Sequence, residues 1–215
     1  MRIVLAGGHG KIALLTEQLL TRGGHQAVGL IRSAGQAADL AAAGAEPVVL
    51  DLEHTDVAAV AAVLAGADAV VFAAGGGPNS GAARKMTMDR DGAVLLADAA
   101  EQAGVRRYLM VSALAADTFD PDSEEVFQIY LRAKSEADAD LRRRDLDWTI
   151  VRPGGLLDDP ATGRVKVAAS TGPGSVPRAD VAAVLVELLV HDLGLRSQFE
   201  LVSGSIPIPE ALRGL

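Results

Sequence analysis

Short apolar runs alternate with longer amphipathic segments along most of the 215-residue chain. Short continuous apolar runs are typical of parallel strands buried on both faces, whereas apolar residues spaced three and four apart are typical of helices. We therefore predict strands at Ile3–Ala6, Ala27–Ile31, Pro47–Leu50, Ala69–Ala74, Arg107–Ser112 and Asp147–Arg152, with shorter ones near Val165–Ala168 and Phe199–Val202. Helices are predicted at Lys11–Arg22, Ala34–Ala43, Val57–Leu64, Asp91–Ala103, Glu124–Arg144 and Arg178–Val190.

This alternation predicts an α/β fold in which helices cover both faces of one doubly wound parallel sheet, the three-layered Rossmann fold. No linker, low-complexity tract or internal repeat interrupts the pattern, so residues 1–215 are expected to form a single domain. About sixty residues follow the sixth strand. We therefore expect only small C-terminal elements beside a shallow substrate cleft over the strand ends.

Composition narrows the class of partner. The formal net charge of −8 disfavours nucleic acid and anionic membranes, because both bind basic surfaces. The chain has no cysteine, which excludes disulfides and thiolate metal sites and fits a reducing cytoplasm. The opening stretch MRIVLAGG is too short for a signal-peptide core, and the apolar stretch Val181–Val190 is too short to span a bilayer. We expect a cytoplasmic protein with a small-molecule partner, no metal site and no membrane segment.

A glycine-rich turn follows the first predicted strand and reads Gly7-Gly8-His9-Gly10-Lys11-Ile12-Ala13. Residues without a Cβ permit a tight turn and a close approach of a pyrophosphate, and a small residue lets the helix pack on the strand. The free N–H groups and the positive end of the helix then face the phosphates. We predict that this turn binds a dinucleotide. His9 and Lys11 could contact phosphate or could be solvated.

The next strand ends predict the remaining cofactor contacts. Arg32 and Ser33 follow the second strand, where an NAD-preferring site usually has an acidic residue. Because a guanidinium suits a 2′-phosphate, we predict NADP(H), with NAD(H) less favoured, unless Arg32 is an ordinary surface cation. Asp51, with Leu52 beside it, could accept a hydrogen bond from the adenine or could cap a helix. The small residues Ala73-Ala74-Gly75 would admit the adenosine ribose and the pyrophosphate, or form a plain loop.

Tyr130 and Lys134 stand four residues apart on a predicted helix and therefore share one face. A lysine ammonium beside a phenol lowers the pKa of the phenol, which can then exchange a proton with a carbonyl or hydroxyl group. The alternative is a half-buried ring beside a lysine that extends to solvent. From spacing alone, both interpretations stay open.

Several stretches together resemble a known family. They are GGHGKIA, FAAGG, MDRDGAVLLADAAEQAGVRRYLMVSALAAD, YLRAKSEADADL, LDWTIVRPGGLLDD and VPRADVAAVL, which follow in order over nearly the whole chain. The chain resembles the atypical short-chain dehydrogenase/reductases, specifically the compact NAD(P)H-binding members related to flavin and biliverdin reductases and to NmrA-like regulators. The resemblance implies pyrophosphate contacts from Gly7, Gly10 and Ala13, a 2′-phosphate contact from Arg32, an adenine contact from Asp51, and further cofactor contacts from Ala74 and Gly75. Ile12, within the same turn, is also expected to contact the cofactor.

The same resemblance implies a catalytic pair, Tyr130 and Lys134, with Lys134 also on the nicotinamide ribose. It implies that Pro153, Gly154, Gly155 and Leu156 line the nicotinamide, and that Asp89 replaces an Asn that braces the sheet in extended members. One position departs from the family. Relatives carry a Ser or Thr just after the fifth strand, whereas here Ser112 comes early and Ala113-Leu114 follow. Ser112 either substitutes for that residue or leaves the triad incomplete.

The favoured hypothesis is an NADPH-dependent oxidoreductase acting on a small carbonyl, quinone or flavin. Tyr130 would donate the proton, Lys134 would tune it, and Ser112 would donate a hydrogen bond to the substrate. The alternative is a non-catalytic NADP(H)-binding redox sensor. A sugar-nucleotide epimerase or dehydratase is less favoured, because the C-terminal portion is short for a nucleotide-sugar pocket. The helices at 124–144 and 178–190 could pair across a two-fold axis, so both a monomer and a homodimer stay open.

Overall fold

The main feature of the fold is one long twisted sheet. The computed structural model describes residues 1–77 and 80–215. In chain order the strands of this sheet are β1 (Arg2–Ala6), β2 (Gln26–Ile31), β3 (Glu46–Val49), β4 (Ala69–Phe72), β5 (Arg107–Val111), β6 (Asp147–Pro153), β8 (Arg164–Ala168), β10 (Ser197–Ser203) and β11 (Ile206–Pro207). They lie in the order β11-β8-β10-β6-β5-β4-β1-β2-β3. Two short strands, β7 (Gly155–Leu157) and β9 (Ser175–Pro177), pair separately in parallel.

The strand directions create a reversal point beside β1. Strands β1 to β6 and β10 run parallel, whereas β8 is antiparallel to β10 and β11 is antiparallel to β8. Strand β1 pairs with β2 on one side and β4 on the other, so successive strands are added in opposite directions from it. Ligands of open α/β sheets bind beyond the carboxyl ends of the strands at such a point. The predicted Rossmann fold is confirmed, with an antiparallel edge that the pattern did not indicate.

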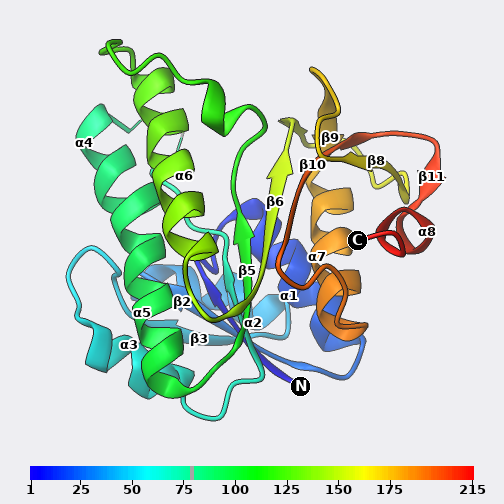
Figure 1. The fold of residues 1–215 in the computed structure, drawn as a ribbon. Coiled ribbons are helices and arrows are strands. Elements are labelled where there is room, and N and C mark those ends of the chain that lie inside the picture. Colours follow the sequence, from blue (N-terminus) through cyan, green and yellow to red (C-terminus); the bar gives the residue numbers. More distant parts are fainter. Residues whose placement is uncertain (78–79) are drawn as a thin grey trace.

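Helices cover both faces of the sheet (Figure 1). One layer holds α1 (Lys11–Arg22), η1 (Ala34–Gln36), α2 (Ala37–Ala42), α7 (Arg178–Val190) and α8 (Ile208–Leu212). The other holds α3 (Val57–Leu64), α4 (Ala82–Arg84), the π-helix η2 (Lys85–Gly92), α5 (Ala93–Ala103) and α6 (Val126–Arg142), with the short η3 (Ala116–Thr118) before α6. Strand β1 shows why two cores form: Ile3 and Leu5 face the first layer, and Val4 and Ala6 face the second.

The structure differs from the predicted elements in two places. The helix expected from Asp91 begins at Ala82, because η2 precedes α5 without a break. Its first turns carry the buried polar residues Lys85 and Asp89, which hide the apolar period there. In the C-terminal part, β7, β9, β11 and α8 were not predicted. Elements of two to five residues are too short to display a hydrophobic period.

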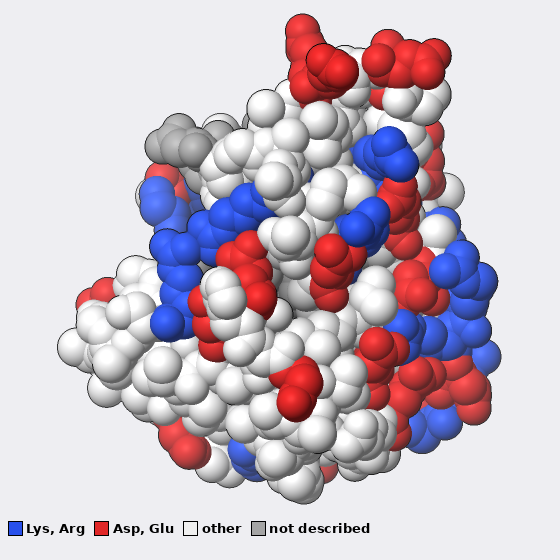
Figure 2. All heavy atoms as spheres, turned by 90° about the vertical axis from the view of Figure 1, so that its left-hand side faces the viewer, with Lys and Arg blue, Asp and Glu red and all other residues white. Residues whose placement is uncertain are grey.

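Both edges of the long sheet carry a proline. The outer strand β3 contains Pro47, and the outer strand β11 ends at Pro207. A proline has no N–H to donate to a further strand. Figure 2 shows acidic and basic side chains interspersed on the face where α4 and α5 lie, so neither sign dominates it. Within residues 1–77 and 80–215, no helix is both long and apolar enough to cross a membrane.

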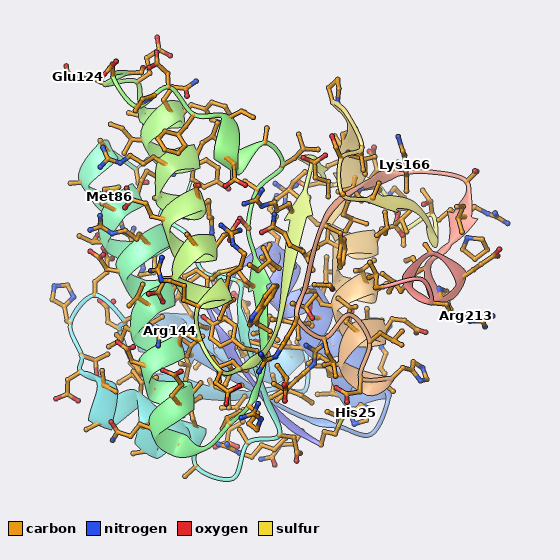
Figure 3. All side chains as sticks on the ribbon, viewed as in Figure 1. His25, Met86, Glu124, Arg144, Lys166 and Arg213 are labelled. Carbon is orange, nitrogen blue, oxygen red and sulfur yellow. The ribbon has the colours of Figure 1, made fainter. Side chains whose placement is uncertain are left out.

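An ion-pair cluster joins α5 to α6. The guanidinium of Arg144 lies 2.7 Å from Asp98, 2.8 Å from Glu101 and 2.6 Å from Asp140. Figure 3 shows Glu124 and Arg144 beyond opposite ends of α6, so this cluster lies far from the end of the helix that carries Tyr130. Ion pairs therefore fix the C-terminal end of α6 to α5. The N-terminal half of α6 forms part of a cleft described below.

Candidate functional site

The glycine turn after β1 is closed too tightly for any side chain at its first position. Gly7 has φ +79°, and a Cβ on it would lie 2.6 Å from the Cα of Ala74. The Gly10 N–H donates to the Gly7 carbonyl at 2.8 Å, and no side chain caps the start of α1. The first amides of this 12-residue helix therefore face outward without a side-chain partner. These features fit a diphosphate held by backbone N–H groups.

A second close approach supports the turn from behind. A Cβ on Gly8 would lie 2.7 Å from the Cα of Gly29 in β2, so α1 can pack on the sheet only where both residues are glycine. The carboxyl group of Glu17 is buried beside these two glycines, and both its oxygens lack a hydrogen-bond partner within the described residues. Burial raises the pKa of Glu17 to about 8. Neither Gly29 nor Glu17 was singled out from the sequence, because each matters only through its neighbour.

The strand ends form the first half of a cleft, with a volume of about 250 Å³. It is lined by Gly7, His9, Gly10, Leu30, Ile31, Arg32, Gln36, Leu50, Asp51, Leu52, Ala73, Ala74, Gly75, Gly76, Gly77, Arg84 and Met88. We call this the nucleotide half. The structure thus brings together most of the predicted cofactor residues from the ends of β1, β2, β3 and β4. Arg84 and Met88, from the helical segment before α5, were missed.

The charged side chains that line the nucleotide half differ in whether they have a partner within the protein. Arg32 is exposed and has no carboxylate within 4.0 Å in the part of the chain that the structure describes. Arg84, in contrast, lies 2.9 Å from Glu53. Burial alone would raise the pKa of Asp51, but hydrogen bonds from the Glu53 backbone and the His54 ring hold it below its usual value. Arg32 is therefore available to an anion, and Asp51 is an ionised acceptor.

Three of the predicted contacts are engaged elsewhere. His9 lines the nucleotide half, and its Nε2 lies 2.6 Å from Asp39. Lys11 does not line the cleft and instead pairs with Asp158 at 2.5 Å. The hydroxyl of Ser33 accepts from the Gly35 N–H at 3.4 Å and caps η1. Lys11 and Ser33 therefore have partners within the protein, and neither lines the cleft.

A second and larger half of the cleft, about 600 Å³, opens next to the first. It is lined by Ile12, Ala73, Ala74, Gly75, Gly77, Lys85, Asp89, Val111, Ser112, Val126, Phe127, Tyr130, Lys134 and Leu156. We call this the substrate half. Both halves share Ala73, Ala74, Gly75 and Gly77 at the end of β4, so one elongated ligand can extend from one half into the other.

Lys134 is held as an ammonium at the bottom of the substrate half. Its Nζ donates to the Val111 carbonyl at 3.1 Å and lies 3.3 Å from Asp89, and both side chains are almost fully buried. Burial would lower the pKa of Lys134, but the Asp89 carboxylate outweighs it and raises the value. Asp89 also accepts from the Gly76 N–H at 2.9 Å. Asp89 therefore links Lys134 to the glycine loop, a role different from the sheet brace that the resemblance implied.

Tyr130 lines the same half of the cleft, with the Lys134 Nζ 5.9 Å from its ring centre. Burial raises the pKa of Tyr130, and the Lys134 charge opposes this effect only in part. Our expectation of a lowered phenol pKa is therefore wrong for the net shift, because desolvation of the ring exceeds the attraction of the ammonium. At neutral pH the phenol carries its proton and can donate it.

The Ser112 hydroxyl donates its proton to a residue outside the cleft lining. Its Oγ donates to Oδ2 of Asp138 at 2.7 Å, and the Arg152 guanidinium lies 2.7 Å from the same oxygen. Arg152 also makes a two-pronged contact with Asp117 at 2.7 and 2.9 Å. The hydroxyl proton of Ser112 is thus donated to a buried ion pair. In this arrangement Asp138 accepts the Ser112 hydroxyl hydrogen, and the expected donation from Ser112 to a substrate stays a prediction.

The segment after β6 contributes less than expected. Of Pro153, Gly154, Gly155 and Leu156, only Leu156 lines the described cleft. A Cβ on Gly154 would lie 2.3 Å from the Gly174 carbonyl, and the Gly155 N–H donates to that carbonyl at 2.9 Å. These glycines allow β7 and β9 to approach each other. Their role in the structure is therefore to shape the wall that carries Leu156.

Comparison with known proteins identifies the family. Residues 7–192 match the model of the NAD(P)H-binding family. The chain belongs to this family. It is 37% identical over 216 residues to the uncharacterised sugar epimerase YhfK of Bacillus subtilis, covering 100% of both chains.

Solved structures agree. A Bacillus halodurans protein, provisionally classed as an NAD-dependent epimerase/dehydratase, has 35% identity, a TM-score of 0.91 and 100% coverage of both chains. The anaerobillin reductase ChuY of Escherichia coli O157:H7 has 28% identity and a TM-score of 0.80, with 96% of this chain and 98% of ChuY covered. The predicted nicotinamide-nucleotide-binding fold and family are thereby confirmed, and the neighbours of this chain include both epimerase/dehydratase-like and reductase-like proteins.

Proposed function

We propose that this protein is an NADPH-dependent reductase of a small carbonyl, quinone or flavin substrate. The observation that carries the proposal is that a protonated Tyr130 and a buried Lys134 ammonium line the same cleft as the glycine turn. Proton donors beside a nicotinamide site are the requirement for reducing a carbonyl to an alcohol. The shared lining at the end of β4 supports one continuous site for cofactor and substrate.

The nucleotide half fits a phosphorylated dinucleotide. The backbone of Gly7 to Gly10 and the start of α1 would hold the diphosphate, and Asp51 would accept from the adenine amino group. Arg32, which has no carboxylate partner among the described residues, would bind the 2′-phosphate and favour NADPH over NADH. When bound, NADPH supplies the hydride of the reduction.

The substrate half supplies the proton. Tyr130 would give its phenolic proton to the substrate oxygen, and the Lys134 ammonium would stabilise the phenolate that remains. Asp89 keeps Lys134 charged and in place. The walls from Ile12, Val126 and Phe127 are apolar and suit a flat ring beside these polar groups.

Substitution of Tyr130 tests the proposal directly. Tyr130→Phe should reduce NADPH-dependent carbonyl reduction by about 10²–10⁴-fold, while the Kd for NADPH stays within about twofold, because only the proton donor is lost. Flavin reduction should fall less, since hydride transfer to a flavin requires less proton assistance. Full carbonyl reduction by the variant would remove Tyr130 from the mechanism.

A redox sensor that binds NADP(H) without turnover is the second candidate, and the inward-turned proton of Ser112 favours it. NADPH oxidation above background with a panel of quinones, aldehydes and flavins would rule it out. The names of YhfK and of the Bacillus halodurans protein refer to epimerases, so the panel should include nucleotide sugars with NAD⁺.

A further inference from the structure

Two lysine side chains line the substrate half, and they differ in how their charge is balanced. Lys134 lies 3.3 Å from the Asp89 carboxylate. Lys85, from the first turn of η2, is 7% exposed and lines the same wall. Its Nζ donates to the Gly77 carbonyl at 2.6 Å and lies 5.2 Å from the centre of the Tyr130 ring.

No carboxylate compensates Lys85. Across residues 1–77 and 80–215, no Asp or Glu oxygen lies within 4.0 Å of its Nζ. The neighbouring cations of the same helical segment are paired: Arg84 contacts Glu53 at 2.9 Å, and Arg90 contacts Glu136 at 3.0 Å. A buried charge is costly unless it is paired and hydrogen-bonded. Lys85 is therefore an exception to the local rule.

The position of the unpaired charge indicates what would balance it. An ammonium has three donors, and the Gly77 carbonyl uses one of them. The remaining donors lie at a cleft whose walls, from Val126, Phe127 and Leu156, are apolar. A ligand that fills this half with a ring and places an anionic substituent near Tyr130 would satisfy both the walls and the charge.

We propose that Lys85 recognises the carboxylate of an apolar, ring-containing substrate. The proposal rests on the proposed function, because it assigns the substrate class of the same cleft. The Lys85 ammonium would pair with the substrate carboxylate, while the Lys134 ammonium, whose charge Asp89 balances, serves Tyr130. The other anion within reach is a phosphate of the cofactor, since Gly77 lines both halves. The experiment must separate these two sources.

Binding of non-reacting ligands provides a test that does not need catalysis. Protein loaded with NADP⁺ is titrated calorimetrically with 2-naphthoate and with its neutral analogue 2-naphthamide. Three variants are compared with the unmodified chain: Lys85→Gln keeps an N–H donor for the Gly77 carbonyl but removes the charge, Lys85→Arg keeps the charge, and Arg90→Gln removes a paired charge from the same helix. The Kd for NADP⁺ is measured for each variant in the same way.

The unmodified chain should bind 2-naphthoate about ten- to hundredfold more tightly than the amide, as expected of a hydrogen bond to a charged group. Lys85→Gln should abolish this preference and leave the Kd values for the amide and for NADP⁺ within about twofold. Lys85→Arg and Arg90→Gln should retain the preference. This result would stand even if no substrate were reduced, in which case the proposed function alone would fail.

Three outcomes would overturn the inference. The unmodified chain could bind both ligands equally, which would mean that Lys85 attracts no carboxylate. Lys85→Gln could weaken both ligands equally, which would make Lys85 a structural tether of the glycine loop. It could instead weaken NADP⁺ by tenfold or more, which would assign the ammonium to a cofactor phosphate.

Discussion

The two halves of the cleft are built from different material. The nucleotide half is built around close approaches of main chains at the ends of β1 to β4, with Gly7 against Ala74 and Gly8 against Gly29. The substrate half takes its polar side chains mainly from η2 and α6, and there Lys134 is paired with Asp89 while Lys85, among the described residues, bonds only a backbone carbonyl. Ligand binding in the nucleotide half should therefore depend on the space between main chains. Ligand binding in the substrate half should depend on how its buried charges are balanced.

The largest effect should follow from filling that space. Gly7→Ala places a Cβ 2.6 Å from the Cα of Ala74 and puts alanine at φ +79°. We expect NADPH binding to weaken by about a hundredfold or more, measured by calorimetry. Gly24→Ala is the matched control, because Gly24 has the same φ and no atom within 4 Å of the added Cβ. If both variants lost NADPH binding equally, the positive φ of the new alanine would explain the loss, and the close contact with Ala74 would not.

A second test concerns Glu17, whose carboxyl group is buried beneath the nucleotide half. Because the folded-state pKa of Glu17 is raised to about 8, its protonated form stabilises the fold below about pH 4.5, and this contribution is lost as the pH rises through 8. Between pH 5 and 8.5 the unfolding free energy should fall by on the order of 3 kcal/mol from this group. Glu17→Gln should remove that slope in urea titrations. If the variant kept the same dependence of unfolding free energy on pH, the Glu17 carboxyl would be solvated in the folded protein.

The charge balance of the substrate half is tested by Asp89→Asn. Without the carboxylate, burial lowers the pKa of Lys134 against only the remaining contributions of Tyr130 and Asp138, so the ammonium should lose its proton at a lower pH. The alkaline limb of the kcat profile should move to lower pH. Below that limb kcat should change little. If the alkaline limb stayed at the same pH, Asp89 would have no part in setting the charge of Lys134 beside Tyr130.

The smallest of these effects concerns cofactor choice. Arg32→Ser should weaken NADPH by about tenfold and leave NADH nearly unchanged, because only the 2′-phosphate loses its partner. The ratio of the two Kd values reports the effect, and Arg84→Ser is the comparison, since Arg84 is already paired with Glu53. If both nucleotides weakened together, Arg32 would bind the shared part of the cofactor.

The contrast between the halves also explains what the sequence could predict. Gly7, Arg32, Asp51 and Ala74 follow strand ends, and the carboxyl ends of parallel strands meet at one edge, so a local pattern places them together. The remainder depends on partners distant in the chain. Ser112 is turned by Asp138, 26 residues away, and no spacing rule indicates that pair.

Two further features lay beyond the sequence for related reasons. The π-helix η2 brings Lys85 and Asp89 to the cleft from a stretch that carries no clear apolar period. The family resemblance implies that the glycines after β6 line the nicotinamide, yet Gly154 is required by the close approach of the Gly174 main chain. In both places the decisive contact is tertiary, and composition gives no sign of it.

The prolines on the two outer strands bear on how copies of this chain can associate. With Pro47 on β3 and Pro207 on β11, neither margin offers an uninterrupted row of N–H donors. Strand addition, the usual route from sheet edges to fibrils, is blocked at these positions. A homodimer of this chain would therefore be joined through helices or loops, and its assembly would leave the sheet at its present width.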